Sequence, residues 1–417
     1  MKKVFWMILL MGTISLAQAQ DKKSVFMAGA AKAVMTPDMS NAAVPVWLAG
    51  YQGGRAAAGV HDDLWITALA LQDARGTALF ITLDLIGYLF DEVSQTKALL
   101  EKELKVPSSR IFIFSTHNHS GPDTIGLWGK DGKTGKDPNY LNALRGKIKA
   151  CAQEAMENFS PARAAFGGIR YDNPIEDSRP PKVMNDLLLS MRLEDLEGKT
   201  IATLVNYALH AEVLNGKNTR ITSDYPGVLR KQLEKEYGGV GIFVPADIGG
   251  MQSPFVLFHS FWARDRVGKS IAKKVIESLS GSKAIEIPSF NIRTQDILFP
   301  VENKKYIGAI ESGLFGRSQE FLKKVDGKYY LPADIGLIEI GPAKFLTLPG
   351  EAFPELGNVY RFKMTGDYRF VLGLANNEIG YLVPDDEWQN DGYEENMSLG
   401  PQTAAILTKA VTELLRR

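Results

Sequence analysis

The chain has 417 residues, of which 45% are hydrophobic and 23% are charged, a composition typical of a globular protein with a large core. Lysine plus arginine and aspartate plus glutamate number 48 each, so the charge balance indicates no nucleic-acid partner and no electrostatic attachment to a membrane. Beyond the N-terminal segment, no stretch approaches the roughly 20 apolar residues of a transmembrane helix, and the oligomeric state stays open.

Residues 1–19 have the features of a cleaved signal peptide. Two lysines precede an apolar run from Val4 to Leu16, and the run closes on the small-x-small pattern Ala17-Gln18-Ala19 that signal peptidase recognises. No cysteine stands at the cleavage site to carry a lipid. We therefore expect export of a soluble mature chain to the periplasm or to the outside of the cell.

Strand-like and helical patterns are interleaved along the rest of the chain. Apolar strand-like runs occupy residues 78–86, 110–116, 200–209, 241–246, 337–348 and 369–375. Helical patterns occupy residues 91–104, 138–157, 226–237, 263–279 and 402–416. This interleaving predicts an α/β fold, with mixed β-sheets covered by helices in a single large catalytic domain over residues 20–417. Insertions that line a cleft are expected at 120–137, 170–186 and 299–335.

The single cysteine, Cys151, belongs to the 138–157 helix. It falls on the apolar face that Leu144 and Ile148 also occupy. We expect it to pack in the core, and one cysteine cannot form an internal disulfide.

Polar residues gather where the predicted strands end. Five segments pass from a buried strand pattern into polar residues, namely RIFIFSTHNHSGPD, TIATLVNYALHAE, GIFVPADIGGMQSP, AKFLTLPGE and FVLGLANNEIGY. In α/β enzymes, active sites are built in a crevice at the carboxyl ends of strands. The sequence therefore predicts one polar crevice to which five strand ends contribute.

His117 and His119 are the first candidates for this crevice. They are separated by one residue at a strand end, where side chains at i and i+2 share a face. Ser115, Thr116 and Ser120 supply hydroxyl groups beside them. Histidines at this spacing also occur in cores and on surfaces without a metal, so the pair by itself leaves both interpretations open.

His210, Glu351 and Tyr381 follow three further strand patterns. Their structural alternatives are a satisfied core histidine, a carboxylate that stabilises a helix N-terminus and a core aromatic residue. The chain has only five histidines, and three at polar strand ends suit a zinc site, which commonly takes three protein ligands plus water. The remaining two, His61 and His259, lack such surroundings and are expected to be structural.

The order and spacing of the motifs resemble the catalytic, N-terminal domain of the neutral, non-lysosomal ceramidase family. The resemblance rests on THNHSGPD, NYALHAE, TSDYPGVL, GGMQSP, LPGE and GLANNEIGY followed by GYEEN. It extends from about Ala28, with GAAKAVMTPD and GVHDDLWITALALQD, to the final helix. The resemblance implies a zinc site whose ligands correspond to His117, His210, Glu351 and Tyr381.

The resemblance also implies residues on the substrate side of the metal. His119, the second histidine of the HxHSGP motif, is expected to bind or polarise the substrate carbonyl. Tyr393 lies twelve residues after Tyr381, as a second tyrosine does in the family. Arg179, in EDSRPP, matches an arginine of the family. Together, His119, Tyr393 and Arg179 are expected to stabilise a tetrahedral oxyanion.

The chain departs from the family pattern in two places. The family's GDxSP segment is GMQSP here, so Ser253 is retained while Met251 replaces the acidic residue. We therefore expect metal-activated water to attack and Ser253 to form a hydrogen bond in the cleft. The sequence also ends where the family continues into a further β-sandwich domain, so we expect no such domain here, which leaves the substrate open.

These features predict an exported, ceramidase-like zinc amidohydrolase that cleaves the N-acyl bond of a small-molecule or lipid-like amide. In one alternative, the same site acts on an ester, a lactone or another N-acyl compound. In another, the protein is a non-catalytic periplasmic binding protein with a structural zinc. A two-metal phosphoesterase is disfavoured, because the sequence has no dense Asp/His cluster. Asp224 and Asp247 are candidates for ligand orientation or proton relay, with turn or helix-cap roles as the alternative.

Overall fold

A computed structural model describes residues 25–40, 45–316 and 322–416 of the chain. The predicted signal peptide, residues 1–19, lies outside these described residues. None of the helices in the described part of the chain is long and apolar enough to span a bilayer.

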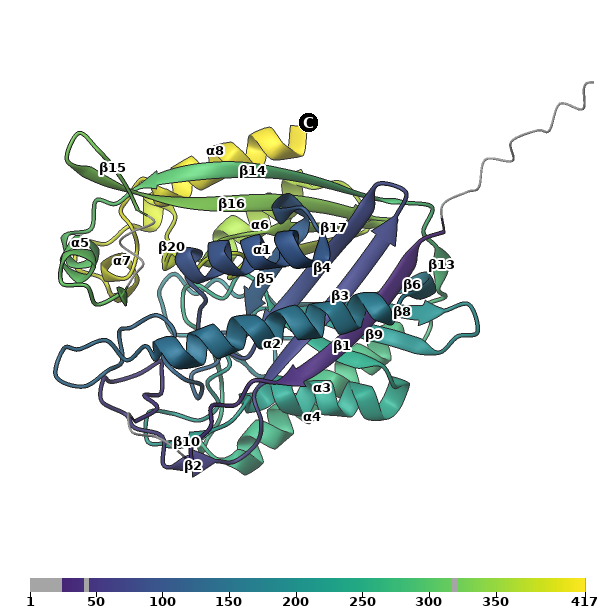
Figure 1. The fold of residues 1–417 in the computed structure, drawn as a ribbon, viewed down its shortest axis with the longest axis horizontal. Coiled ribbons are helices and arrows are strands. Elements are labelled where there is room, and N and C mark those ends of the chain that lie inside the picture. The colour runs from purple at the N-terminus through teal and green to yellow at the C-terminus, as the bar shows by residue number, and fades with distance from the viewer. Residues whose placement is uncertain (1–24, 41–44, 317–321, 417) are drawn as a thin grey trace, which may run out of the picture.

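The larger of two main sheets has nine strands and a mixed pattern of parallel and antiparallel pairs (Figure 1). The strand order is β11-β9-β8-β6-β1-β3-β4-β5, and the short β13 pairs with β6. The outer pairs β4–β5 and β9–β11 are parallel. The strands are β1 (Met27–Val34), β3 (Trp65–Asp73), β4 (Gly76–Leu83), β5 (Ile111–Ser115), β6 (Ser160–Arg170), β8 (Leu187–Asp195), β9 (Thr200–Tyr207), β11 (Val240–Pro245) and β13 (Ile285–Glu286).

The second half of the chain forms a second sheet, which packs against the first. Its order is β14-β16-β17-β19, with β15 on β16, and β17 runs parallel to β19. The strands are β14 (Phe290–Pro300), β15 (Lys323–Val325), β16 (Lys328–Ile340), β17 (Ala343–Thr347) and β19 (Tyr368–Leu372). Three two-stranded pairs complete the structure: β2 (Gly59–Val60) with β10 (Arg220–Ile221), β7 (Ile175–Asp177) with β12 (Gln252–Pro254), and β18 (Glu351–Ala352) with β20 (Tyr381–Leu382).

Helices cover the outer faces of both sheets, which gives four layers (Figure 1). The larger sheet is covered by α1 (Phe90–Leu104), α2 (Pro138–Glu157), α3 (Asp224–Tyr237) and α4 (Phe261–Leu279). The second sheet is covered by α6 (Pro354–Lys363) and α8 (Thr403–Arg416). Two short helices, α5 (Lys304–Glu311) and α7 (Tyr393–Asn396), lie near each other at one end of the molecule.

Alternation along the strands explains how one sheet serves two cores. In β4, Phe80 belongs to the core between the sheets, whereas Leu79 and Ile81 belong to the core beneath α1 and α2. Between the sheets, Phe345 and Phe370 stack with ring centroids 4.3 Å apart. Because both faces of the larger sheet are buried, its strands are mostly continuous apolar runs.

The predicted α/β class with mixed sheets and covering helices is confirmed. Each predicted helix and each predicted strand run corresponds to an observed element, with one correction. The run 337–348 was expected as one strand, but it contains the end of β16 and all of β17. Gly341, with φ of 54°, turns the chain between them. Cys151 is buried in α2, as expected.

Candidate metal centre

Three buried side chains meet beyond the ends of β5, β9 and β17. His117 follows β5, His210 follows β9, and Glu351 opens the short strand β18 after β17. The Nε2 atoms of His117 and His210 lie 3.3 Å and 3.1 Å from Glu351 Oε2. The structure thus brings together three of the four predicted ligands from strands that are far apart in sequence.

Backbone carbonyls orient both imidazole rings. His117 Nδ1 lies 2.8 Å from the Ile86 carbonyl oxygen, and His210 Nδ1 lies 3.0 Å from that of Gln252. A carbonyl oxygen only accepts, so each Nδ1 carries a proton, and Nε2, on the Glu351 side of the ring, is the atom that can bind a metal once it is deprotonated. Metal–ligand bonds of about 2.0–2.1 Å in a tetrahedron separate the donor atoms by about 3.3 Å, close to the observed distances. The donor set therefore fits one metal ion.

Strand pairing places Tyr381 beside Glu351. β18 and β20 are parallel, and Glu351 is in register with Tyr381. The Tyr381 hydroxyl interacts with the Glu351 carboxylate and lies 3.8 Å from the sulfur of Met251. The fourth predicted ligand is therefore at the same site as the other three.

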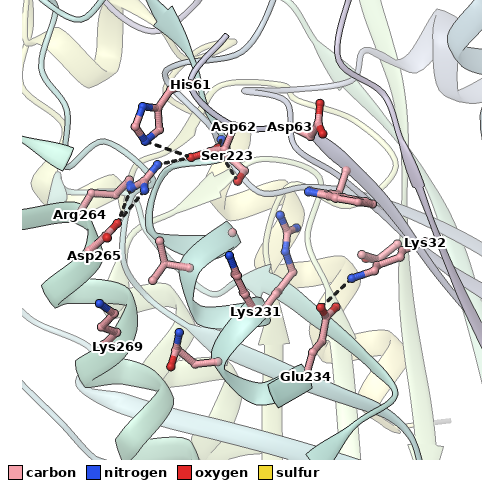
Figure 2. Close-up of a pocket in the computed structure, with 16 residues that line it drawn as sticks. Lys32, His61, Asp62, Asp63, Ser223, Lys231, Glu234, Arg264, Asp265 and Lys269 are labelled. Atoms are coloured by element: carbon pink, nitrogen blue, oxygen red, sulfur yellow. Dashed lines mark hydrogen bonds and ion pairs between the residues drawn. The ribbon is translucent and has the colours of Figure 1, made fainter. Parts of the chain in front are cut away.

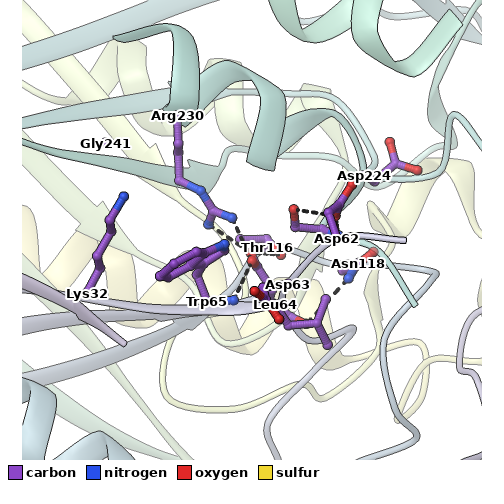
Figure 3. Close-up of polar contacts among 12 residues, drawn as sticks. Lys32, Asp62, Asp63, Leu64, Trp65, Thr116, Asn118, Asp224, Arg230 and Gly241 are labelled. Carbon is purple, nitrogen blue, oxygen red and sulfur yellow. Dashed lines mark hydrogen bonds and ion pairs between the residues drawn. The ribbon is translucent and has the colours of Figure 1, made fainter. Parts of the chain in front are cut away.

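A buried ion pair holds the loop that carries His117 (Figure 3). Arg230 of α3 donates to both carboxylate oxygens of Asp84, at 2.8 Å and 2.6 Å. Thr116 donates its hydroxyl to the same carboxylate, and the Asn118 amide donates to the Asp84 carbonyl. Between these two residues His117 has φ of 59°, a conformation that non-glycine residues rarely adopt. The surrounding contacts thus fix the ligand in a strained backbone geometry.

The titration of these groups couples one carboxylate to two imidazoles. Burial disfavours the charged form of His210, but its contacts with Glu351 and Glu212 outweigh burial and raise the pKa of this ring. Burial favours the neutral form of Glu351, but His117 and His210 outweigh it and hold the pKa of this carboxyl below its usual value. Burial also lowers the pKa of His117, which keeps the ring neutral. Burial and then the charge of Glu351 raise the pKa of Glu378 well above its usual value. A second carboxyl near the ligands therefore remains protonated while Glu351 carries the charge.

Glu378 and Glu212 are two site residues that sequence reasoning missed. Donor atoms of Glu378, His117 and Glu351 all lie within 4.8 Å of one another, as do those of His117, His119 and His210. Both glutamates stand inside motifs that the sequence analysis quoted, NNEIGY and HAE. A carboxylate in a polar strand-end motif was the signal available, but neither spacing nor resemblance distinguished these two.

Glu212 connects His119 with Ser253. Ser253 donates its hydroxyl to Glu212 Oε1 at 2.5 Å, and Glu212 Oε2 lies 3.3 Å from His119 Nδ1. Both ring nitrogens of His119 are buried, and the residue lines the cavity over the centre. Burial, reinforced by His117 and His210, lowers the pKa of His119 well below its usual value. His119 is therefore neutral, with Nδ1 directed at a carboxylate.

Of the two remaining candidates, Tyr393 lines the cavity over the centre and Arg179 does not. Tyr393 opens α7 and lines the cavity, with its ring centroid 6.0 Å from that of Tyr381. Arg179 does not line the cavity; it binds Glu394 and Glu395 of α7, each at 2.7 Å. Its guanidinium therefore holds the helix that presents Tyr393.

The cavity above the centre has a volume of about 530 Å³ and a mostly apolar wall. The candidate site residues His117, His119, Glu351, Tyr381 and Tyr393 lie along it. Its apolar wall consists of Ile86, Leu89, Ile125, Leu127, Trp128, Ala309, Leu314, Phe315 and Met397. Several of these residues come from the stretches 120–137 and 299–335, which were expected to line a cleft.

The remaining acidic candidates have structural partners. Asp224 accepts from the backbone amides of Val213, Leu214 and Tyr225 where α3 begins. Asp247 forms an ion pair with Arg361. Asp224 therefore stabilises a turn through backbone amides, and Asp247 forms a structural ion pair.

The two other histidines are also held by contacts away from the centre. His61 stacks on Phe261 with ring centroids 3.7 Å apart. His259 Nδ1 lies 2.9 Å from the Val213 carbonyl oxygen. Neither residue lines the cavity above the candidate ligands.

Comparisons with known proteins match this fold to the ceramidases. The neutral ceramidase from Pseudomonas aeruginosa superposes with a TM-score of 0.77 and 18% identity, over 94% of this chain and 74% of that one. A structure described as ceramidase complexed with C2 superposes with a TM-score of 0.77 and 17% sequence identity, over 94% of this chain and 75% of that one. No family model matches the chain.

Curated relatives show a similar sequence over a shorter span. Neutral ceramidase B of Dictyostelium discoideum is 25% identical over 233 residues, 49% of this chain and 31% of its own length. Neutral ceramidase of Drosophila melanogaster is 25% identical over 243 residues, 50% of this chain and 33% of its own length. The matched segments thus span about a third of these relatives. The expected resemblance to the neutral ceramidase family is confirmed.

Proposed function

We propose, from this resemblance to the neutral ceramidases, that the protein is an exported zinc-dependent amidohydrolase acting on a lipid-like N-acyl compound. One observation carries the proposal: two imidazole nitrogens and a carboxylate oxygen converge at an apolar-walled cavity. Nitrogen and oxygen donors at this spacing suit zinc. The N-terminal sequence pattern supports the proposed export.

His117, His210, Glu351 and Tyr381 would hold the zinc ion. When bound, zinc supplies a Lewis acid and lowers the pKa of water to about 7, so that a nucleophile is available at neutral pH. Backbone carbonyls already fix the two histidine rings, so binding requires no rearrangement of these rings.

His119 is suited to accept a proton rather than to donate one. We assign the proton to Nδ1, which lies 3.3 Å from Glu212 Oε2, and this leaves the Nε2 lone pair of the neutral ring as an acceptor. In that tautomer it accepts a hydrogen bond from the nucleophilic water or from a substrate N–H or O–H group. Polarisation of the carbonyl oxygen, one of the two roles expected for His119, uses the other tautomer, with the proton on Nε2. Tyr393 on the cavity wall has the hydroxyl that can donate to the oxyanion.

Ser253 is poorly placed to act as the nucleophile. Its hydroxyl donates to Glu212, and it is not among the residues that line the cavity. Water as the nucleophile, with Ser253 holding Glu212 in position, agrees with these contacts. The apolar wall supports an acyl or other hydrocarbon chain as the part of the substrate that is bound.

Metal analysis combined with a substrate panel tests the proposal. The purified protein should contain about one zinc per chain and should hydrolyse long-chain N-acyl amides, including N-acyl-sphingosines, faster than simple acyl esters or lactones. Chelation should abolish turnover, and added zinc should restore it. Ester turnover above amide turnover would assign the same site to an esterase, and stoichiometric zinc without any turnover would identify a binding protein.

A further inference from the structure

An exposed apolar patch lies in the segment that directly follows Ser253. The segment between β12 and the first turn of α4 carries Phe255, Leu257, Phe258 and Trp262, whose exposed fractions are 58%, 83%, 77% and 66%. We call these four residues the apolar loop. Single exposed apolar residues are common on protein surfaces, but four large ones within eight positions mark an interaction site.

The apolar loop has a defined conformation. The Phe255 amide donates to the Pro174 carbonyl at 2.7 Å, and His259 contacts the Val213 carbonyl at 2.9 Å. Ser260 caps α4 by accepting from the Ala263 amide. These contacts hold the backbone, and the exposed apolar side chains lie around a hollow of about 410 Å³. Binding therefore requires little ordering of the segment.

A row of cations continues from the apolar loop along α4. Arg266, Lys269 and Lys273 follow Trp262 by four, seven and eleven positions, so all four lie on one face of the helix. All three cations are exposed, and none forms an ion pair within the described ranges. Figure 2 shows Lys269 separate from the neighbouring pair of Arg264 and Asp265. The Arg266 guanidinium lies 4.8 Å from the centroid of the Trp262 ring.

We propose that this surface docks on an anionic phospholipid membrane. The apolar loop enters the boundary between headgroups and acyl chains, and Arg266, Lys269 and Lys273 contact lipid phosphates. Interfacial segments combine these features, with aromatic and aliphatic side chains on one part and unpaired Lys or Arg on the adjoining part. A bilayer also accepts projecting side chains without matching pockets, which a protein partner would have to provide. This inference goes beyond the proposed hydrolase and is independent of the chemistry in the cavity.

Vesicle co-sedimentation of the full mature chain tests the proposal without any turnover assay. The wild-type protein should sediment with vesicles containing phosphatidylglycerol, and less with phosphatidylcholine vesicles. The variant Leu257→Ser/Phe258→Ser/Trp262→Ser should bind at least tenfold more weakly. The control Phe362→Ser removes an equally exposed aromatic residue (87%) on α6 and should bind as wild type. Because all these side chains are exposed, thermal unfolding should change little.

Charge variants test the second half of the surface. Lys269→Gln/Lys273→Gln should weaken binding to anionic vesicles by about fivefold for each removed charge, and salt should diminish the difference. Wild-type protein that fails to sediment with anionic vesicles would overturn the proposal. So would equal loss of binding in Phe362→Ser. If the triple variant instead abolishes a concentration-dependent dimer in solution and wild type ignores vesicles, the surface is an interface between copies of this chain.

Discussion

Two cavities of similar size have opposite interiors. The cavity over the metal centre has a volume of about 530 Å³, and a groove bordered by β1, β3, α3 and α4 has about 670 Å³ (Figure 2). In the groove, several charges are paired with one another, as Lys32 is with Glu234 and Arg264 with Asp265, whereas Lys269, which also lines it, forms no ion pair within the described ranges. In the first cavity, two histidine nitrogens face one carboxylate oxygen, and His119 lines the wall with both ring nitrogens buried.

This difference separates a structural polar cluster from a reactive one. Charges that neutralise one another within the protein have little left with which to bind a ligand, and their value lies in holding elements together. Donor atoms that converge without an internal counter-charge need an ion or a substrate. Volume alone would have selected the groove, whereas the pairing of the polar atoms selects the smaller cavity. Substitutions should therefore affect function in one cavity and stability in the other.

The largest effect on function is expected when one of the proposed metal ligands is removed. His210→Ala should lose zinc and reduce amide hydrolysis by about a thousandfold or more, because the metal contributes several kcal/mol to catalysis. Zinc is measured by elemental analysis after gel filtration, together with kcat/KM. His61→Ala and His259→Ala remove the two histidines outside the centre and should keep full zinc. Undiminished zinc in His210→Ala would remove this residue from the ligand set.

Beside the groove, the largest effect on stability should fall on the pair of Asp84 and Arg230, in which Arg230 lines the groove and Asp84 also contacts the loop that carries His117. Asp84→Asn leaves Arg230 buried with a neutral partner, and breaking a buried pair costs about 3 kcal/mol or more of unfolding free energy. Denaturant unfolding measures this loss. Asp265 is a more exposed partner of Arg264, so Asp265→Asn should cost less than about 1 kcal/mol of unfolding free energy. Equal losses in the two variants would mean that burial of the Asp84 pair has no special importance.

A smaller effect is expected at the cavity wall. Tyr393→Phe should lower kcat by about a hundredfold while zinc content and folding stay at wild-type values, because the hydroxyl acts only on charge that develops during the reaction. The ring that packs near Tyr381 is preserved. Wild-type turnover by this variant would show that the oxyanion is stabilised by another group.

Loss of the carboxylate that positions His119 should lower kcat by less than the loss of the Tyr393 hydroxyl does. Glu212→Gln keeps the size of the side chain but removes the carboxylate, and we expect about a tenfold loss of kcat with KM and zinc unchanged, as for other residues that orient site histidines. Glu176→Gln, at an exposed carboxylate in the neighbouring strand β7, provides the control. A change in KM alone would assign Glu212 to substrate binding.

The smallest effect is expected at Ser253. Ser253→Ala should lower kcat by about fivefold, the value of one hydrogen bond of roughly 1 kcal/mol, because the hydroxyl serves only to hold Glu212. Steady-state kinetics on the best amide measures this. Complete inactivity with zinc still bound would restore Ser253 as the nucleophile.

Much of the fold and of the cluster could be predicted, because strands with two buried faces are long apolar runs and the polar residues stand at their ends. His117, His210 and Glu351 could be placed at one crevice on that basis. The pairing of β18 with β20, which carries Tyr381 to Glu351, depends on two residues in each strand and leaves no periodic signal. The strand β1 is rich in alanine and includes Gly29 and Lys32, so its apolar pattern is weak.

Side-chain partners were harder to predict than positions. The contacts of Glu212 with His119 and Ser253 join three separate segments, and no local pattern specifies them. The balanced overall charge also conceals local asymmetry, since the row of Arg266, Lys269 and Lys273 disappears in a total of 48 against 48. Composition describes the average surface, whereas binding depends on the arrangement of a few residues.

The clamp of Arg179 on Glu394 and Glu395 has a consequence for substrate choice. It fastens α7 to the segment after β7, so the tyrosine at the start of α7 has a fixed position at the cavity. A fixed entrance sorts substrates by cross-section before any bond is broken, because a bulky headgroup cannot push the helix aside without breaking two short ion pairs. Linear acyl amides should therefore enter more readily than branched ones, and discrimination between them should show in KM more than in kcat.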